Sequence, residues 1–182
     1  MRHFSLSELE AGIDLVIDAP AELGILALIV RRPAEGEREV LESAQLDLIE
    51  GLVGDSWRVR ARLTPDGVPD PYSQINLMNS RAISLVAGGR ERWPLAGDQL
   101  YVDFDISQDN LPPGSQLAIG ATVIEVSAQP HTGCQKFSQR FGVDALRFVN
   151  SEAGRKLRLR GLNARVVVPG TIRPGDPVRK QL

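Results

Sequence analysis

The sequence contains few of the residues from which metal centres and disulfide frameworks are usually built. Its 182 residues include one cysteine, Cys134, and two histidines, His3 and His131, which lie far apart. A single cysteine excludes an intrachain disulfide, and within one chain it excludes a zinc or iron–sulfur site with several cysteine ligands. Two distant histidines also argue against a histidine-rich metal site.

Long apolar runs and an excess of charge of one sign are missing as well. The longest apolar stretch, 23–30, is too short to cross a bilayer, and acidic residues soon follow the first five positions, unlike a secretory signal. The net charge of −2 and the aromatic content of 5% argue against a nucleic-acid-binding protein. We therefore expect a cytoplasmic protein with no membrane or nucleic-acid partner. The oligomeric state is unknown from the sequence.

Several well-known catalytic and ligand-binding motifs are absent. There is no GxxxxGK[ST] phosphate loop, no HExxH, no GxSxG and no CxxC. The segment 103–109 places oxygen-bearing side chains at calcium-loop positions. However, Gln108 stands where the sharp turn needs glycine, and Gly114 stands where a bidentate glutamate belongs. We interpret this segment as a strand with solvated acids that runs into a turn.

The chain does contain many short β-prone segments separated by glycine and proline. The pattern predicts strands over 23–30, 74–78, 99–104, 117–119, 122–127 and 164–168. It predicts helices over 40–49, 79–86 and 138–149, and a loop over 64–72. The length fits one domain. Many short strands with few helices predict a mainly β fold, a β-barrel with peripheral α-helices.

The cysteine lies in a segment with several features of a functional loop. Cys134 follows a predicted strand, and Gly133 before it allows close approach by a ligand. His131 and Lys136 can supply positive charge, which favours the thiolate. A thiolate is the form that binds soft metals or carries sulfur. An unreactive cysteine buried in the core is the alternative, and without a family argument it is the favoured one.

The basic run 155–160 is a second candidate. If it forms a strand, its leucines face inward, and Lys156, Arg158 and Arg160 line the opposite face. Such a row suits a phosphate group, whereas the alternative is a solvated outer face, which composition alone favours.

Several segments in a fixed order resemble the MOSC family, named for the C-terminal domain of molybdenum-cofactor sulfurase. They are 51–55 (GLVGD), 74–78 (QINLM), 110–114 (NLPPG), 117–120, 123–126, the cysteine segment, 161–166 and 170–178. The resemblance covers about 51–180. On this basis we interpret residues 1–182 as a single MOSC-like domain in which 1–22 form an N-terminal extension.

The resemblance implies a barrel-like fold and a molybdenum cofactor (molybdopterin). It also implies a cysteine that binds the molybdenum or carries sulfur, and Cys134 matches that position, although many members have proline where Gly133 stands. His131 is the expected catalytic partner of the cysteine. The cofactor carries a phosphate, so we expect basic residues to bind it. The candidates from charge are Lys136, Arg81, Lys156, Arg158 and Arg160.

Two functions follow, and the sequence leaves open whether the protein is an enzyme. The first is a molybdenum-cofactor oxidoreductase that reduces N-hydroxylated compounds, as some relatives do. No flavin or iron–sulfur site is evident, so this function needs a separate electron-donor protein. The second is a sulfur carrier or cofactor-binding module, which would hold a persulfide or the cofactor on Cys134 without turnover and could depend on a sulfur-donor protein.

Overall fold

A closed β-barrel of seven strands is the centre of the computed structural model, which describes residues 2–181. The barrel strands follow the order β11-β7-β8-β9-β5-β6-β1, and pairing of β1 with β11 closes it. The barrel strands are β1 (Gly24–Arg31), β5 (Ile75–Asn79), β6 (Leu100–Asp103), β7 (Gln116–Ile119), β8 (Thr122–Val126), β9 (Leu162–Val168) and β11 (Pro177–Gln181). This confirms the predicted β-barrel.

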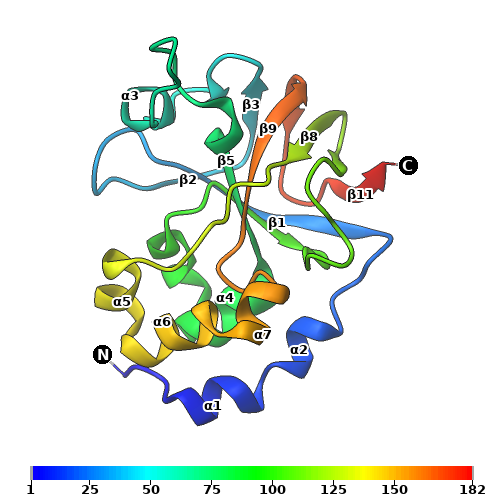
Figure 1. Ribbon diagram of the computed structural model, residues 1–182. Helices are drawn as coiled ribbons and strands as arrows, with labels where there is room; N and C mark the ends of the chain where they lie inside the picture. Colours follow the sequence, from blue (N-terminus) through cyan, green and yellow to red (C-terminus); the bar gives the residue numbers. More distant parts are fainter. Residues whose placement is uncertain (1, 182) are drawn as a thin grey trace.

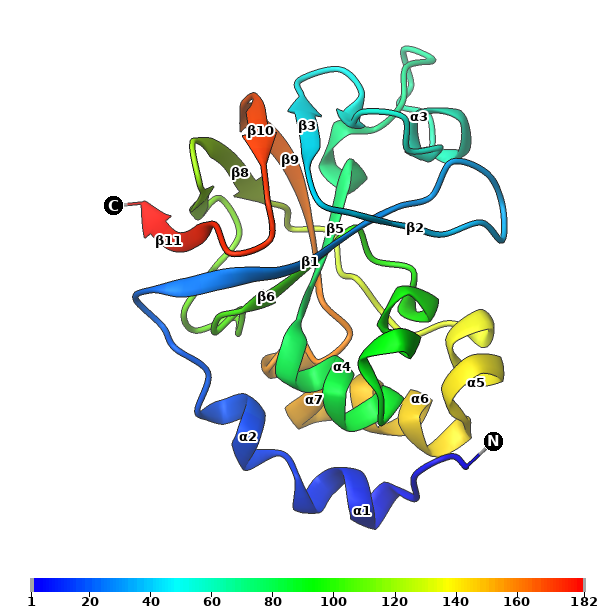
Figure 2. The same cartoon turned by 180° about the vertical axis from the view of Figure 1, so that it is seen from behind.

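The remaining strands lie outside the ring. β2 (Glu39–Leu41) pairs with β1, while β3 (Ala44–Asp47), β4 (Gly51–Leu52) and β10 (Gly170–Ile172) form a separate three-stranded sheet. The helices are α1 (Leu6–Ala11), α2 (Asp14–Ile17), α3 (Trp57–Arg60), α4 (Ser80–Ala87), α5 (Gln135–Phe141), α6 (Val143–Asn150) and α7 (Glu152–Lys156), with 3-10 helices η1 (Pro71–Ser73) and η2 (Arg90–Ala96). Figures 1 and 2 show α3 near β3, whereas the other α-helices gather at the opposite end of the barrel.

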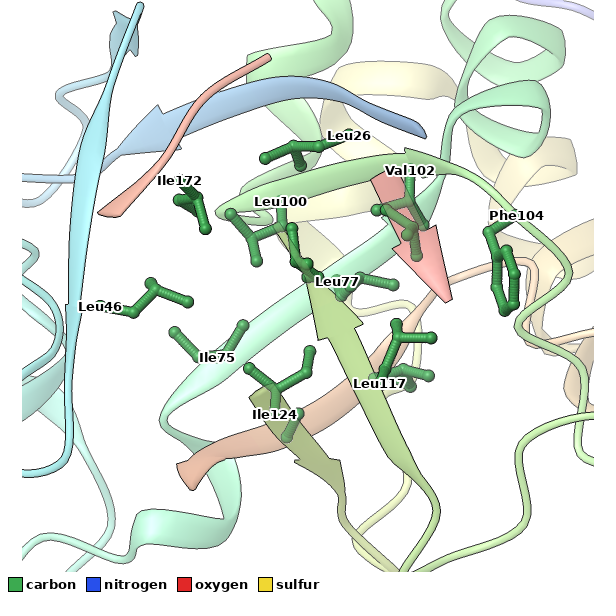
Figure 3. Packing of buried hydrophobic residues seen from close by; sticks show 14 of the residues in the cluster. Leu26, Leu46, Ile75, Leu77, Leu100, Val102, Phe104, Leu117, Ile124 and Ile172 are labelled. Carbon is green, nitrogen blue, oxygen red and sulfur yellow. The ribbon is translucent and has the colours of Figure 1, made fainter. Parts of the chain in front are cut away.

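Apolar side chains fill the interior of the barrel. Leu26, Leu77, Leu100, Leu117 and Ile124 come from five different strands and are fully buried in one cluster. Figure 3 shows these side chains pointing toward one another. The barrel is therefore a packed core without room for a ligand along its axis.

A second apolar cluster joins the barrel to the helices. Leu28 and Val30 of β1 belong to it, together with Tyr101 of β6 and the buried rings of Phe137 and Phe148. Strand β1 is therefore buried on both faces, which explains why its sequence is continuously apolar.

The parallel pairing of β5 and β6 determines where the helices begin. A parallel pair needs a crossover connection, and α4 and η2 supply it. Asn79 caps α4, because its Oδ1 accepts hydrogen bonds from the backbone N–H groups of Arg81 and Ala82 at 2.7 and 3.2 Å.

The predicted helix over 40–49 is wrong. Burial alternates from Ala44 to Asp47, as in a strand. Leu46 is fully buried, although it is not on the apolar face of the predicted helix. The segment forms β3 and pairs with β10 and β4, so tertiary pairing overrides the local helical pattern.

Two other predictions need correction. The helix expected over 138–149 is two helices, because Gly142 has a φ of +97° and separates α5 from α6. The strand expected over 155–160 is instead the end of α7 and a turn, and Ser151 caps this helix. Among residues 2–181, no helix is both long enough and apolar enough to cross a membrane.

Candidate functional site

Cys134 is exposed, so the alternative of a buried core cysteine is wrong. It is the residue directly before α5, with extended backbone angles, and its side chain makes no capping hydrogen bond. The thiol is therefore accessible both to a ligand and to another protein.

Polar side chains fix the backbone that leads to Cys134. The amide Nδ2 of Asn163 donates to the carbonyl oxygens of Gln129 and Pro130 at 3.2 and 3.4 Å. Asn150 binds both sides of Gly133, accepting from its N–H at 3.0 Å and donating to its carbonyl at 3.2 Å. These contacts anchor the segment from Gln129 to Cys134 to both the barrel and α6.

Gly133 lies close against α6. A Cβ at this position would lie 2.8 Å from Leu146 Cδ1 and 3.0 Å from Val149 Cγ2, both on α6. The sequence predicted a close approach at Gly133 by a ligand, but the partner in the structure is a helix.

His131 is bound to a buried carboxylate that the sequence analysis missed. Its Nε2 donates to Asp98 Oδ1 at 2.9 Å, and Arg160 Nη1 donates to Asp98 Oδ2 at 2.6 Å. Complete burial alone would raise the pKa of the Asp98 carboxyl, but the Arg160 guanidinium and His131 outweigh burial and hold this pKa below its ordinary value. Burial and the charge of Arg160 also lower the pKa of His131, so the imidazole is neutral at pH 7.

A pocket of about 250 Å³ lies beside this network. Arg155, Arg158 and Arg160 line it from the α7 side, and His131 and Thr132 line it from the cysteine segment. We call it the arginine pocket. No aspartate or glutamate is among its lining residues, so its electrostatic environment favours an anion.

Arg158 holds a strained backbone conformation in the wall of the arginine pocket. It has a φ of +50° and is the only residue other than glycine with positive φ among residues 2–181. Its Nη1 donates to the carbonyl oxygens of Ile106 and Leu111 at 3.3 and 2.6 Å, and burial lowers the pKa of its guanidinium. Such strain costs about 1–3 kcal/mol and tends to occur at binding sites.

Arg160 is the most buried cation of the pocket. Its Nη2 donates to Ala96 O at 3.0 Å, and its guanidinium lies 5.1 Å from the ring centre of Phe137. Within residues 2–181 its buried Nε has no hydrogen-bond partner, and a buried donor left unpaired is costly.

The other basic candidates are engaged elsewhere. Arg81 pairs with Asp103 at 2.6 Å and donates to the carbonyl of Asp18, so it joins α4 to β6 and the N-terminal helices. Lys136 pairs with Glu35 at 2.6 Å. Lys156 pairs with Asp109 at 3.2 Å and lies outside the arginine pocket. The structure therefore brings together His131, Arg158 and Arg160 and leaves the other three apart.

Arg155 lines the arginine pocket but was not among the predicted site residues; predicting a helix in this segment would have made it a candidate. Ser151 is followed by a short run of good helix formers, which is the signal of a helix start. The assumed strand instead placed Arg155 on the same face as the leucines. No local signal identifies Asp98, because its role depends on residues 33 and 62 positions away.

A second buried network supports the site from the other side. Arg32 forms a bidentate pair with Asp55 at 2.8 and 2.9 Å, and its Nη1 donates to Asn76 Oδ1 at 2.8 Å. Asn76 in turn donates to Asn163 Oδ1 at 2.7 Å. The chain of contacts reaches the Pro130 backbone through Asn163.

The described residues, 2–181, contain no group of three or more His, Cys, Asp or Glu side chains that could hold a metal ion. The acids of the calcium-like segment are also engaged, since Asp103 pairs with Arg81 and Asp109 with Lys156. A metal bound at Cys134 would need most of its ligands from a cofactor.

Comparison with known proteins identifies the fold and a family. The family model described as the MOSC domain matches residues 74–179. No curated protein matches the chain. The YuaD protein from Bacillus subtilis has a similar structure, with a TM-score of 0.65 at 14% identity, over 86% of this chain and 94% of that one.

Two further solved structures have the same fold. YiiM from Escherichia coli matches with a TM-score of 0.55 and 17% identity, over 87% of this chain and 70% of that one. YiiM from Geobacillus stearothermophilus matches with a TM-score of 0.57 and 15% identity, over 87% and 75%.

Proposed function

The chain belongs to the MOSC domain family, and we propose that it binds a molybdenum–pterin cofactor, with Cys134 at the metal and the arginine pocket at the cofactor's phosphate. The observation that carries this proposal is the position of the pocket. The same short segment contributes His131 and Thr132 to the pocket and places Cys134 two residues further on. Two residues of chain span at most about 7 Å, so one ligand can reach both places.

The donors of the arginine pocket fit a phosphate group. Guanidinium groups bind phosphate oxygens through charge-assisted hydrogen bonds, and Arg155 and Arg158 both reach the pocket. Arg160, which also lines the pocket, adds positive charge. The volume of about 250 Å³ is smaller than the 300–1,000 Å³ of typical ligand pockets, so it suits the phosphate end and leaves the metal end outside.

Cys134 fits the metal end because its thiolate is a soft ligand and its side chain is exposed. When bound, molybdenum supplies two-electron oxidation and reduction, while the protein binds and orients the cofactor. Lys136, next but one to Cys134, has no role in this proposal, because Glu35 already pairs with its ammonium group.

We assign proton handling to His131. Its Nε2 donates to Asp98, so in the neutral ring Nδ1 carries the lone pair and can accept a proton. Asp98 holds the ring in this orientation, and Arg160 holds Asp98.

The proposed reaction is the reduction of a small substrate, such as an N-hydroxylated compound, by the loaded protein. Electrons would come from a separate donor protein that binds near the exposed Cys134.

Exposure of Cys134 also favours a second function. A sulfur carrier must present its persulfide to a donor and an acceptor protein, and an exposed thiol directly before α5 allows this. In that case the arginine pocket would bind a different anion.

Metal and sulfur analysis tests the proposal. The wild-type chain, purified from a host that makes the cofactor, should contain about one molybdenum per chain. Cys134→Ser should contain less than a tenth as much, with an unchanged melting temperature because the side chain is exposed. Arg179→Gln, an exposed change on β11, is the matched control and should keep its metal. Wild-type protein without molybdenum but with labile sulfur on Cys134 would replace the cofactor proposal with the carrier function.

A further inference from the structure

Four successive backbone carbonyls at the end of η2 each accept a hydrogen bond from a different arginine. The donors come from four separate parts of the chain. Arg38 Nε binds Pro94 O at 3.2 Å, Arg140 Nη1 binds Leu95 O at 2.6 Å, Arg160 Nη2 binds Ala96 O at 3.0 Å, and Arg32 Nη1 binds Gly97 O at 2.8 Å. The carbonyl end of a helix carries partial negative charge, which explains why cations collect there.

Only two of these arginines are neutralised. Arg32 pairs with Asp55 and Arg160 pairs with Asp98. Within residues 2–181, neither Arg38 nor Arg140 forms an ion pair with a carboxylate.

Arg38 and Arg140 also lie close together. A Cβ built on Gly97 would lie 3.6 Å from Arg38 Nη2 and 3.8 Å from Arg140 Nη1. Both residues are partly buried. Burial and the neighbouring charges of Arg140 and Arg32 lower the pKa of Arg38, which is the effect expected of crowded like charges. An anion between the two guanidinium groups would relieve this repulsion.

Unused donors remain on both side chains. Within residues 2–181, Arg38 Nη2 has no hydrogen-bond partner, and on the Arg140 side chain only Nη1 has one. These N–H groups are the donors from which guanidinium groups form forked hydrogen bonds to oxyanions. Glu35, an acid on the same loop as Arg38, is already paired with Lys136 of α5.

We propose that Arg38 and Arg140 form a second anion site, which takes the phosphoryl group of a small ligand. Two fixed positive charges match a phosphate dianion better than a single carboxylate. The site is separate from the arginine pocket, because neither residue lines that pocket. It does not rest on cofactor binding, so metal-free protein can test it.

The test is calorimetric titration of metal-free protein with inorganic phosphate at constant ionic strength. The expected result is saturable binding with a component that is weakened at least tenfold in Arg38→Gln and in Arg140→Gln but is kept in Arg158→Gln, which removes an arginine of the arginine pocket instead. Arg140→Lys keeps the charge but loses the forked geometry, so it should bind with intermediate affinity. Arg179→Gln is the matched control and should bind as the wild type does, and acetate should bind at least tenfold more weakly than phosphate.

Several results would overturn the site. They are no phosphate binding by the wild type, unchanged binding in both glutamine variants, or equal affinity for acetate. Loss of all phosphate binding in Arg158→Gln, with normal binding in Arg140→Gln, would assign phosphate to the arginine pocket alone. Melting temperatures show which variants are folded. If Arg38→Gln does not fold, the Arg140 variants alone test the site. They are expected to fold, because the Arg140 side chain makes a single, exposed hydrogen bond, from Nη1 to Leu95 O.

Discussion

Cys134 and Asp98 illustrate two ways in which single residues define the site. The side chain of Cys134 is exposed, so its position depends only on the backbone of the segment before it. Asp98 is completely buried and binds His131 and Arg160 together. A buried carboxylate is stable only when it is fully paired, so this triad of residues is a structural requirement and also orients the imidazole.

For single residues, the sequence indicated which side chains have suitable chemistry but not which other side chains they contact. The position of Cys134 after a strand, with glycine before it, made this residue a candidate, but the resemblance to the MOSC family was needed to prefer it over a buried, unreactive cysteine. Arg158 and Arg160 were selected for their charge, and they do line one pocket. Arg81 and Lys156 had the same charge, but each pairs with a nearby acid, Asp103 and Asp109. Sequence alone cannot show which cations line a pocket and which pair with an acid outside it.

The triad predicts how stability depends on pH. Folding lowers the pKa of His131 below its ordinary 6.5, so the unfolded chain binds more protons as the pH falls through that value. The free energy of unfolding should therefore decrease as the pH falls below 6.5. Asp98, whose pKa is also lowered, should cause a further decrease below its ordinary 3.8.

Urea unfolding of the wild type and His131→Gln between pH 7.5 and 5 measures the first effect. The wild type should lose stability across this range, and the variant should lose less. Equal slopes in the two proteins would contradict a neutral His131 in the folded protein.

At the scale of elements, α7 and the turn that follows it determine the arginine pocket. The basic run was predicted to be a strand that presents alternate side chains on one face. In the structure α7 ends at Lys156, and the turn brings Arg158 and Arg160 to the pocket beside Arg155. Over only six residues, the alternation of a strand is hard to distinguish from the periodicity of a helix. Here Ser151 acts as the N-cap, and the residues after it form a helix.

The errors in the two predicted helices have different origins, one non-local and one local. The segment predicted as a helix over 40–49 contains β3, which pairs with β10 on one side and with β4 on the other. Little in the sequence indicated either partner, because β10 is distant along the chain and β4 has only two residues. The single helix over 138–149 became two because Gly142 adopts a φ that other residues avoid. The strands of the barrel were predicted better, since burial of their side chains leaves a direct pattern in the sequence.

Removing the cap of α7 should weaken the pocket. Ser151 Oγ accepts from Gly154 N at 2.9 Å, and loss of such a cap costs about 1 kcal/mol. Ser151→Ala should lower the free energy of unfolding by about that amount and raise the protease sensitivity of the segment after Glu152.

Ser115→Ala is the control, because the part of the chain that the structure describes gives Ser115 backbone hydrogen bonds but none to its side chain. Chemical denaturation measures both variants. Identical stabilities would show that the α7 cap is not needed to hold the turn.

At the scale of the whole molecule, barrel closure positions the cysteine segment. β8 and β9 pair within the ring, and the segment from Gln129 leaves β8 next to Asn163 of β9. On the other side, Asn76 of β5 connects the same asparagine to Arg32 and Asp55. The barrel thus supplies a rigid frame, and the loop that leaves it carries the exposed thiol.

The central claim is that the Cys134 thiolate is a ligand of molybdenum. The chain has one cysteine, so Cys134→selenocysteine labels this position alone with selenium. X-ray absorption at the molybdenum edge then reports directly on the neighbours of the metal. The account predicts one selenium neighbour in the labelled protein and none in unlabelled protein. Molybdenum bound to the labelled protein without a selenium neighbour would contradict it.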